Sequence, residues 1–297
     1  MPNLTEGLNS WLKSSNHNRM LDFQEGKSQS TNGSVDVSFY GGSAFKITSP
    51  MGITTMLDPW RNLPTGKWDW YFYDFPKTEV DIGVSTHAHF DHDALHLLDA
   101  SVNLDRLIGT YEFQDVKITG IADKHATDSS AATYDFKKII KEFGGVDITP
   151  PNNPRSWDNC LIKVETGGIS ILHWGDNRHN PPDPIWDKIG HVDIALLPVD
   201  ESQHVLSFVA IEEIIDRLKP SVVIPHHYYI WDVVQRSSTL LPAEPWVNRQ
   251  ERIRIIDAAS TTYKSAKLPK GQTRLDYFGD HLAFDKKAWH ESKGEGG

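Results

Sequence analysis

The stretch Ser85-Thr86-His87-Ala88-His89-Phe90-Asp91-His92-Asp93 is the most informative part of this sequence, because six consecutive residues in it hold three histidines and a carboxylate. The apolar run before it, residues 80–84, predicts a buried strand, and residues 94–98 after it predict the start of a helix. The cluster therefore falls where a predicted strand passes into a predicted helix.

Four side chains of this stretch are expected to reach one space. On an extended segment alternate side chains share a face, so His87, His89 and Asp91 point the same way, and His92 joins them at the turn into the helix. Imidazole nitrogens and a carboxylate form a ligand set for zinc, or for manganese or iron where availability dictates. The alternative is a solvated helix N-terminus capped by Asp93, but unpaired buried imidazoles are costly. We interpret the stretch as a metal site.

The spacing His-x-His-x-Asp-His resembles the signature of the metallo-β-lactamase superfamily, and three later segments follow the order of that family. A short apolar strand ends in His125, where the family places its third histidine. A second strand ends in Gly-Asp, whose aspartate, here Asp176, bridges both metals in the family. A third ends in the family's final histidine, here His227. Each motif stands at the carboxyl end of a predicted strand, and together they span most of the chain.

The resemblance implies two metal ions per chain, with zinc as the expected metal and manganese(II) or iron(II) as alternatives. Seven side chains would hold them. One ion would bind His87, His89 and His125, the other would bind Asp91, His92 and His227, and Asp176 would lie between the two.

Three further residues near the motifs have competing interpretations. His226 and His227 are adjacent, so alternation lets only one face the metals, and the family's ending selects His227. His173 precedes Asp176 by three residues with its face opposite, and we expect it to be structural. Asp58 either shapes the turn with Pro59 or holds a ligand histidine or metal-bound water.

The opening strands indicate one branch of the superfamily. Residues 39–47 followed by residues 52–59 resemble the paired strands of the branch that includes L-ascorbate-6-phosphate lactonase, in which an aspartate ends the second strand beside the metals. The segment from Ala195 to the last strand fits the same branch. Because that branch is functionally mixed, it implies metal-dependent hydrolysis more firmly than any substrate.

The fold expected from the resemblance is an α/β four-layer αββα sandwich, with the metal site at one edge of two sheets. The apolar strands at residues 80–84, 194–197 and 222–224 suit sheets that are covered on their outer faces. We expect a polar extension over residues 1–33 and a single domain over residues 34–285. The domain would carry a lid-like insertion at 126–160, and residues 286–297 would form a disordered tail.

Composition agrees with a sizeable enzyme of 297 residues, and it argues against several classes of partner. The net charge is -10, and no run of basic residues interleaved with aromatics predicts a nucleic-acid groove. A single cysteine, Cys160, excludes an intramolecular disulfide. No apolar stretch is long enough for a signal peptide or a membrane span, so we expect a cytoplasmic protein acting on a small-molecule substrate.

The expected chemistry is hydrolysis by a metal-bound hydroxide at an ester, lactone, amide or phosphodiester bond. Asp91 and Asp176 would act in catalysis through the metals. His204 is the candidate proton donor or substrate-binding residue, with a plain surface loop as the alternative. Two other functions stay open, namely hydrolytic dehalogenation of an aromatic ring on the same centre and a non-catalytic metal-binding role.

Two regions are candidates for substrate selection. The insertion at 126–160 contains an amphipathic helix and a proline-rich loop, and it would act as a lid or pocket wall. The loop at residues 60–76 is dense in tryptophan and tyrosine. Its aromatic side chains would either pack against a neighbouring element or a homodimer partner, or line a pocket for an apolar substrate.

Overall fold

A computed structural model describes residues 23, 33–62, 69–126, 141, 158–201, 205–235 and 240–291 of the chain, and these residues form two β-sheets. In spatial order, the six-stranded sheet consists of β13 (Ser260–Lys264), β1 (Ser34–Phe39), β2 (Phe45–Thr48), β3 (Thr54–Leu57), β4 (Thr78–Ser85) and β5 (Leu98–Asp105). The eight-stranded sheet consists of β12 (Ile253–Ile255), β14 (Arg274–Tyr277), β11 (Val222–His226), β10 (Ile194–Pro198), β9 (Ile169–His173), β8 (Asp158–Thr166), β7 (Val116–Lys124) and β6 (Gly109–Phe113).

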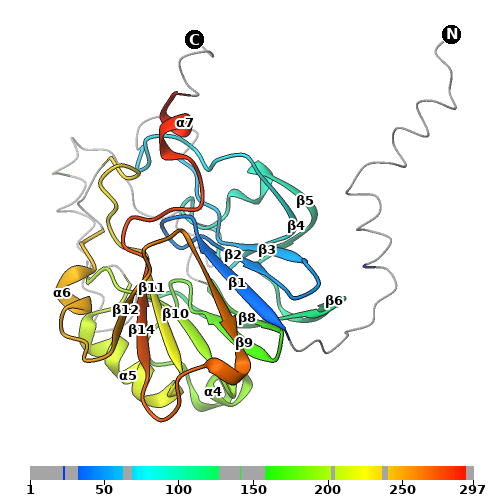
Figure 1. The fold of residues 1–297 in the computed structure, drawn as a ribbon, viewed down its shortest axis with the longest axis vertical. Coiled ribbons are helices and arrows are strands. Elements are labelled where there is room, and N and C mark those ends of the chain that lie inside the picture. Colours follow the sequence, from blue (N-terminus) through cyan, green and yellow to red (C-terminus); the bar gives the residue numbers. More distant parts are fainter. Residues whose placement is uncertain are drawn as a thin grey trace, which may run out of the picture.

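Both sheets are mixed, and their parallel parts follow from apolar sequence. Strands β9, β10 and β11 pair in parallel, and every residue in them is buried, as expected for a sheet covered on both faces. The connections between them carry α4 (Asp183–Ile189) and α5 (Phe208–Leu218), which lie along the outside of this sheet (Figure 1). Helix α5 is amphipathic, and Ser207 caps its N-terminus by accepting a hydrogen bond from the Ala210 N–H.

The inner faces of the two sheets pack against each other. Phe45 of β2 lies edge-on to His173 of β9 and His226 of β11, with ring centroids 6.1 and 6.0 Å apart. Phe39 of β1 contacts Tyr228, which follows β11, at 5.8 Å. Sheets that meet face to face, with helices outside, form an α/β sandwich, and the fold class predicted from the sequence is confirmed.

The four motif segments meet at one rim of this sandwich, as the sequence predicts. His87 follows β4 of the first sheet, whereas His125, Asp176 and His227 follow β7, β9 and β11 of the second. Carboxyl ends of parallel strands collect at one edge of a sheet, which is where α/β folds place their ligands.

The helix predicted to start after Asp93 forms only as one 3-10 turn, η1 (Ala94–Leu97). The chain then becomes β5, which pairs in parallel with β4. Asp93 forms no cap bond and instead pairs with Arg61 at 2.8 Å. Residues 86–92 are bends and turns rather than an extended segment, so simple side-chain alternation does not hold there. The apolar residues at 94–98 suit either structure, and pairing along β4 decides the outcome.

Ordered structure continues into the predicted C-terminal tail. Helix α7 (Lys286–Glu291) is formed, and Trp289 within it packs edge-on against Trp60 at 5.7 Å. Two short elements, α6 (Glu244–Val247) and η3 (Ser265–Lys267), complete the described secondary structure. The substrate-lid prediction, apart from its two ends, and the His204 prediction lie outside the described residues. Among the helices that are described, none has the length and apolar character needed to cross a bilayer.

Candidate metal centre

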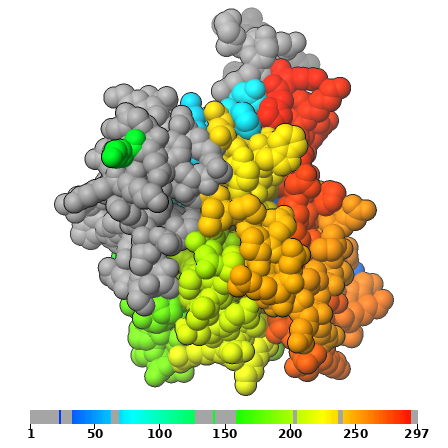
Figure 2. Space-filling view, turned by 90° about the vertical axis from the view of Figure 1, so that its left-hand side faces the viewer, coloured from blue at the N-terminus to red at the C-terminus, as the bar shows by residue number. Residues whose placement is uncertain are grey.

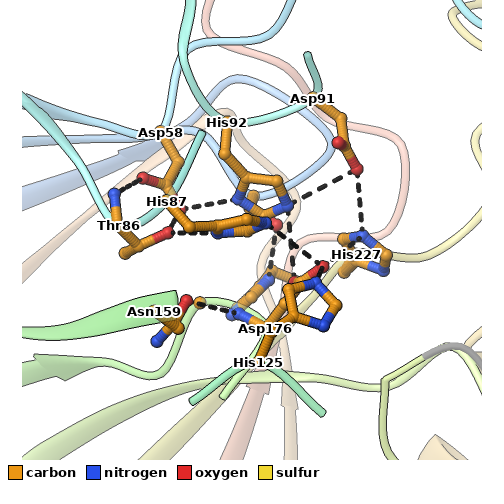
Figure 3. Close-up of polar contacts among 12 residues, drawn as sticks. Asp58, Thr86, His87, Asp91, His92, His125, Asn159, Asp176 and His227 are labelled. Atoms are coloured by element: carbon orange, nitrogen blue, oxygen red, sulfur yellow. Dashed lines mark hydrogen bonds and ion pairs between the residues drawn. The ribbon is translucent and has the colours of Figure 1, made fainter. Parts of the chain in front are cut away.

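The seven side chains predicted to hold metal come together in two groups of four. His87, His89, His125 and Asp176 place one ligand atom each within 4.8 Å of one another, and so do Asp91, His92, Asp176 and His227. Asp176 belongs to both groups and lies between them (Figure 3). All of these residues are buried except His89, which is half-buried. The structure therefore brings together the whole predicted set, in the predicted partition.

The distances between these ligand atoms match those between ligands of one metal ion. Nε2 of His125 lies 3.3 Å from Oδ2 of Asp176, and Nε2 of His92 lies 3.4 Å from Oδ1 of the same carboxylate. Nε2 of His227 lies 3.3 Å from Oδ2 of Asp91. Ligands about 2.0–2.2 Å from a tetrahedral zinc ion lie about 3.3–3.6 Å from each other. The protein alone already holds these atoms at tetrahedral edge lengths.

Two orphaned nitrogens also fit a metal. Among the residues that the structure describes, Nε2 of His87 and Nε2 of His92 are buried and have no hydrogen-bond partner. Burying a polar atom without a partner costs free energy. Because both atoms face the shared carboxylate of Asp176, a cation between them would satisfy both nitrogens and the carboxylate together.

Unusual backbone conformations set the direction of two of the side chains. Asp58 and His227 are non-glycine residues with φ of 46° and 59°, a left-handed conformation that persists where the surroundings enforce it. Gly175, just before Asp176, has φ of 55°, and a Cβ there would lie 2.8 Å from Oγ1 of Thr86. The Gly-Asp motif thus needs glycine for close approach as well as for its turn.

A buried network anchored on Asp58 fixes two histidines of different groups. His92 donates from Nδ1 to Oδ2 of Asp58 at 2.7 Å. Thr86 donates its hydroxyl to the same oxygen at 2.7 Å, so its own oxygen accepts from Nδ1 of His87 at 3.0 Å. Both rings then carry hydrogen on Nδ1 and present the Nε2 lone pair to the centre. Of the two roles considered for Asp58, the structure supports holding a ligand histidine.

A second carboxylate orients His227. Its Nδ1 lies 3.2 Å from Oδ2 of Asp200, a fully buried residue that follows β10, and its backbone N–H donates to the Gly42 carbonyl at 2.8 Å. The Nε2 atom is thereby aimed at Asp91. The ring and backbone of His227 are both held in place.

The neighbouring histidines His173 and His226 point elsewhere. His173 donates from Nε2 to the Ser43 carbonyl at 2.8 Å and accepts at Nδ1 from the Gly175 N–H, which requires a neutral ring. The Nδ1 atom of His226 lies 3.0 Å from the Ser43 hydroxyl. The structure therefore places His227, and not His226, in the metal-ligand groups.

Burial and mutual charge shape the protonation of the centre. For His87, burial and then His92 and His89 hold the pKa well below its usual range. Burial disfavours the charged forms of Asp176 and His227 as well. The neighbouring opposite charges together outweigh burial. His227, His92 and His125 bring the pKa of Asp176 well below its usual range. Asp176, Asp200 and Asp91 raise the pKa of His227 to about 10. Without a metal, the protonated His227 therefore supplies positive charge beside the Asp176 carboxylate, where a cation would also be favourable.

Sequence reasoning missed Thr86, Asp200 and Asn159. Thr86 lies inside the most informative stretch, but its hydroxyl contacts depend on Asp58 from another strand. Asn159 accepts from the Asp176 N–H at 3.3 Å and donates to the Asn177 side chain, contacts between β8 and the loop after β9. In the sequence, the only signal for these residues is a polar residue in or next to an apolar segment, and this signal does not identify the hydrogen-bond partner.

Two packed sheets with buried histidines and aspartates gathered on one rim define a metal-binding protein of the α/β-sandwich class. Residues 36–227, about two thirds of the chain, match the family described as the β-lactamase superfamily domain. The chain belongs to the metallo-β-lactamase superfamily.

Similar proteins agree with this family. A UPF0173 metal-dependent hydrolase of Thermodesulfovibrio yellowstonii is 34% identical over 95 residues, which cover 31% of this chain and 35% of that protein. Another, from Anaeromyxobacter sp. (strain K), is 24% identical over 228 residues, covering 66% of this chain and 75% of that one. A superfamily structure from Thermotoga maritima covers 82% of this chain and all of its own, with a TM-score of 0.55 and 20% identity, which supports the fold. The ascorbate-6-phosphate lactonase branch stays a prediction.

Proposed function

We propose that this protein is a metal-dependent hydrolase whose centre binds two zinc-class ions through the seven side chains of the two groups. One observation carries the proposal. Two four-residue ligand groups share the buried Asp176, and their atoms stand at separations expected between ligands of one ion. The similar UPF0173 proteins, named as metal-dependent hydrolases, support the same activity.

Zinc fits the donor set best, since five imidazole nitrogens and two carboxylates provide the borderline ligands that it prefers. The buried carboxylates supply negative charge to balance two dications. Magnesium and calcium would require more oxygen ligands than the described residues offer at this rim.

The chain's own residues prepare the site for hydrolysis. When bound, two ions of this kind lower the pKa of a water molecule toward neutrality and polarise a substrate oxygen. Asp176 sets the spacing of the two ligand groups through its two oxygens. Asp58 and Asp200 hold His92 and His227 in one orientation. His89 is half-buried, whereas the other ligands are buried, so we expect a substrate to approach from the His89 side of the centre.

The proposal names a class of bonds that the protein cleaves. A centre of this kind attacks carbonyl and phosphoryl groups, so esters, lactones, amides and phosphodiesters are its expected substrates. A small-molecule substrate suits a centre that is almost wholly buried, because only a compact group can reach it.

The test is turnover by the metal-loaded protein on four chromogenic panels, namely esters, lactones, phosphodiesters and haloaromatics. We expect hydrolysis in one of the first three, loss of it with a chelator, and recovery on adding zinc. His89→Ala should abolish turnover with folding retained, whereas His96→Ala, at an exposed position outside both groups, should not. Turnover confined to haloaromatics would favour the dehalogenase reading. Equal activity of His89→Ala and wild type would refute the centre as the site of reaction.

A further inference from the structure

One tyrosine of the aromatic loop, Tyr71, lies beside the metal centre in a rigid setting. Its side chain is 1% exposed, and its ring stacks on Trp60 with centroids 4.2 Å apart and planes 17° apart. Trp60 is itself fully buried, and its Nε1 lies 3.3 Å from the Tyr40 carbonyl, to which it donates. The ring of Tyr71 therefore has a fixed plane and position.

The backbone of Tyr71 is clamped by two side chains from different segments. Asn62 accepts from its N–H and donates to its carbonyl, each at 2.9 Å, and Gln235 donates to the same carbonyl at 2.8 Å. Tyr71 also forms an isolated antiparallel bridge with Val234. In Figure 2 cyan parts of the chain lie beside the yellow and red parts at the top of this face. The loop is braced where Tyr71 stands.

The Tyr71 hydroxyl stands close to the loop that carries His227. A Cβ built at Gly42 would lie 3.1 Å from this hydroxyl oxygen, and Gly42 has φ of 57°. The carbonyl of the same glycine accepts the His227 N–H at 2.8 Å. A single residue, Gly42, thus separates the phenol from the backbone of a predicted ligand. A side chain at position 42 would crowd the hydroxyl.

The phenol of Tyr71 keeps its proton at neutral pH. Burial raises the pKa of Tyr71 well above its usual range, and the nearby carboxylates of Asp91 and Asp176 raise it further. At neutral pH the group is therefore a hydrogen-bond donor. The hydrogen bonds of Tyr71 to other described residues are made by its backbone, which leaves the hydroxyl for a ligand.

An apolar wall continues from Tyr71 toward the open side. Trp70 lies edge-on to Phe90 at 5.3 Å and to His227 at 6.3 Å. Phe90 is half-buried and adjoins His89. In the part of the chain that the structure describes, Nε1 of Trp70 is buried without a hydrogen-bond partner. The wall offers apolar surface next to the centre and a second unused donor.

We propose that Tyr71 is a catalytic residue whose hydroxyl donates a hydrogen bond to the substrate oxygen that gains negative charge beside Asp91 and His227. Trp70 and Phe90 pack against the apolar part of the same substrate. This assignment rests on the proposed hydrolase function. A rigid donor aimed at the developing charge stabilises the transition state without reorganising. The substrate is accordingly one with an apolar or aromatic group attached to its reacting carbonyl or phosphoryl.

The experiment measures oxyanion binding independently of turnover. The protein is loaded with cobalt(II), and inorganic phosphate is titrated while the visible spectrum of the metal is followed. The test variant is Tyr71→Phe, which keeps the ring stack and removes only the hydroxyl. Tyr73→Phe makes the same change two residues away, where the ring contacts Trp289 instead. Metal content and thermal unfolding are measured for all three proteins.

We expect Tyr71→Phe to raise the dissociation constant for phosphate by about 10- to 100-fold, as for loss of a hydrogen bond to an anion. Tyr73→Phe should leave it unchanged, and all proteins should hold equal metal. Unchanged phosphate affinity in Tyr71→Phe would overturn the assignment. Loss of metal or fold in that variant would overturn it too, by showing a structural role for the hydroxyl. If the affinity falls as expected but no substrate is turned over, the hydrolase proposal fails and the Tyr71 contact stands.

Discussion

Thr86→Val removes one hydroxyl and should weaken metal binding in only one of the two ligand groups. The Thr86 oxygen lies 2.7 Å from Oδ2 of Asp58 and 3.0 Å from Nδ1 of His87. Valine has the same shape but lacks the hydroxyl, so Nδ1 of His87 loses its acceptor. The hydrogen bond from the residue 86 N–H to Oδ1 of Asp58, at 2.7 Å, survives because it belongs to the backbone. Asp58 therefore keeps its hold on His92.

The expected effect falls on one ion only. An unsatisfied buried donor costs about 1–3 kcal/mol, and loss of such an orienting partner weakens metal binding by about 10- to 100-fold. The ion held by the His87 group should leave first when zinc is withdrawn by a competing chromogenic chelator. The ion held by the His92 group should leave as in the wild type. Adding Asp91→Asn, which should deplete mainly the second ion, should then release both.

The matched control is Thr55→Val. Thr55 is also buried, and within the described part of the chain its hydroxyl has no hydrogen-bond partner, so the same substitution should not change zinc release. Equal weakening of both ions in Thr86→Val, or of neither, would refute the relay from Asp58 through Thr86 to His87. An effect of equal size in Thr55→Val would show that the change acts through packing.

Three other predictions concern protonation, reactivity and stability. Because the pKa of His227 is raised to about 10, its proton must leave when a metal binds, so zinc affinity should rise with pH up to that value. Calorimetry in buffers of different ionisation enthalpy should detect the released proton, and zero release would contradict this. Burial raises the pKa of Cys160 to about 11, so a thiol reagent at pH 8 should react only as the protein unfolds, and rapid labelling of the folded protein would count against it. Asp276→Ala should lower the free energy of unfolding in urea by up to about 3 kcal/mol. This value is the lower end of the range for a broken buried ion pair, and it applies because the arginine partners of Asp276 are partly exposed. A change no larger than that of exposed Asp257→Ala would refute it.

The ligand set could be predicted from sequence because each of its members follows a strand within a short motif. His125, Asp176 and His227 each stand one to three residues beyond a strand, so local pattern and motif order locate them. The supporting residues carry no such local mark. Thr86 and Asp200 matter through partners 28 and 27 positions away, contacts that exist only once the sheets have packed.

The errors in secondary structure have a similar origin. Residues 94–98 suit a helix, yet only one 3-10 turn forms before strand β5, because β4 offers a long parallel partner. The C-terminal residues look polar, but α7 is held by Trp289, whose Nε1 donates to the Asp74 carbonyl at 3.0 Å. In both cases tertiary pairing overrides local preference. The aromatic loop was ambiguous for the same reason, since only packing shows that Trp60 and Tyr71 stack beside the centre.

The most direct test of the two-metal centre is anomalous diffraction at the zinc edge from crystals of the zinc-loaded protein. We predict two peaks about 3.5–4 Å apart, one among His87, His89 and His125 and the other among Asp91, His92 and His227, with Asp176 between them. A single peak, or none at this rim in protein shown to be folded, would contradict the dinuclear centre and the proposed mechanism with it.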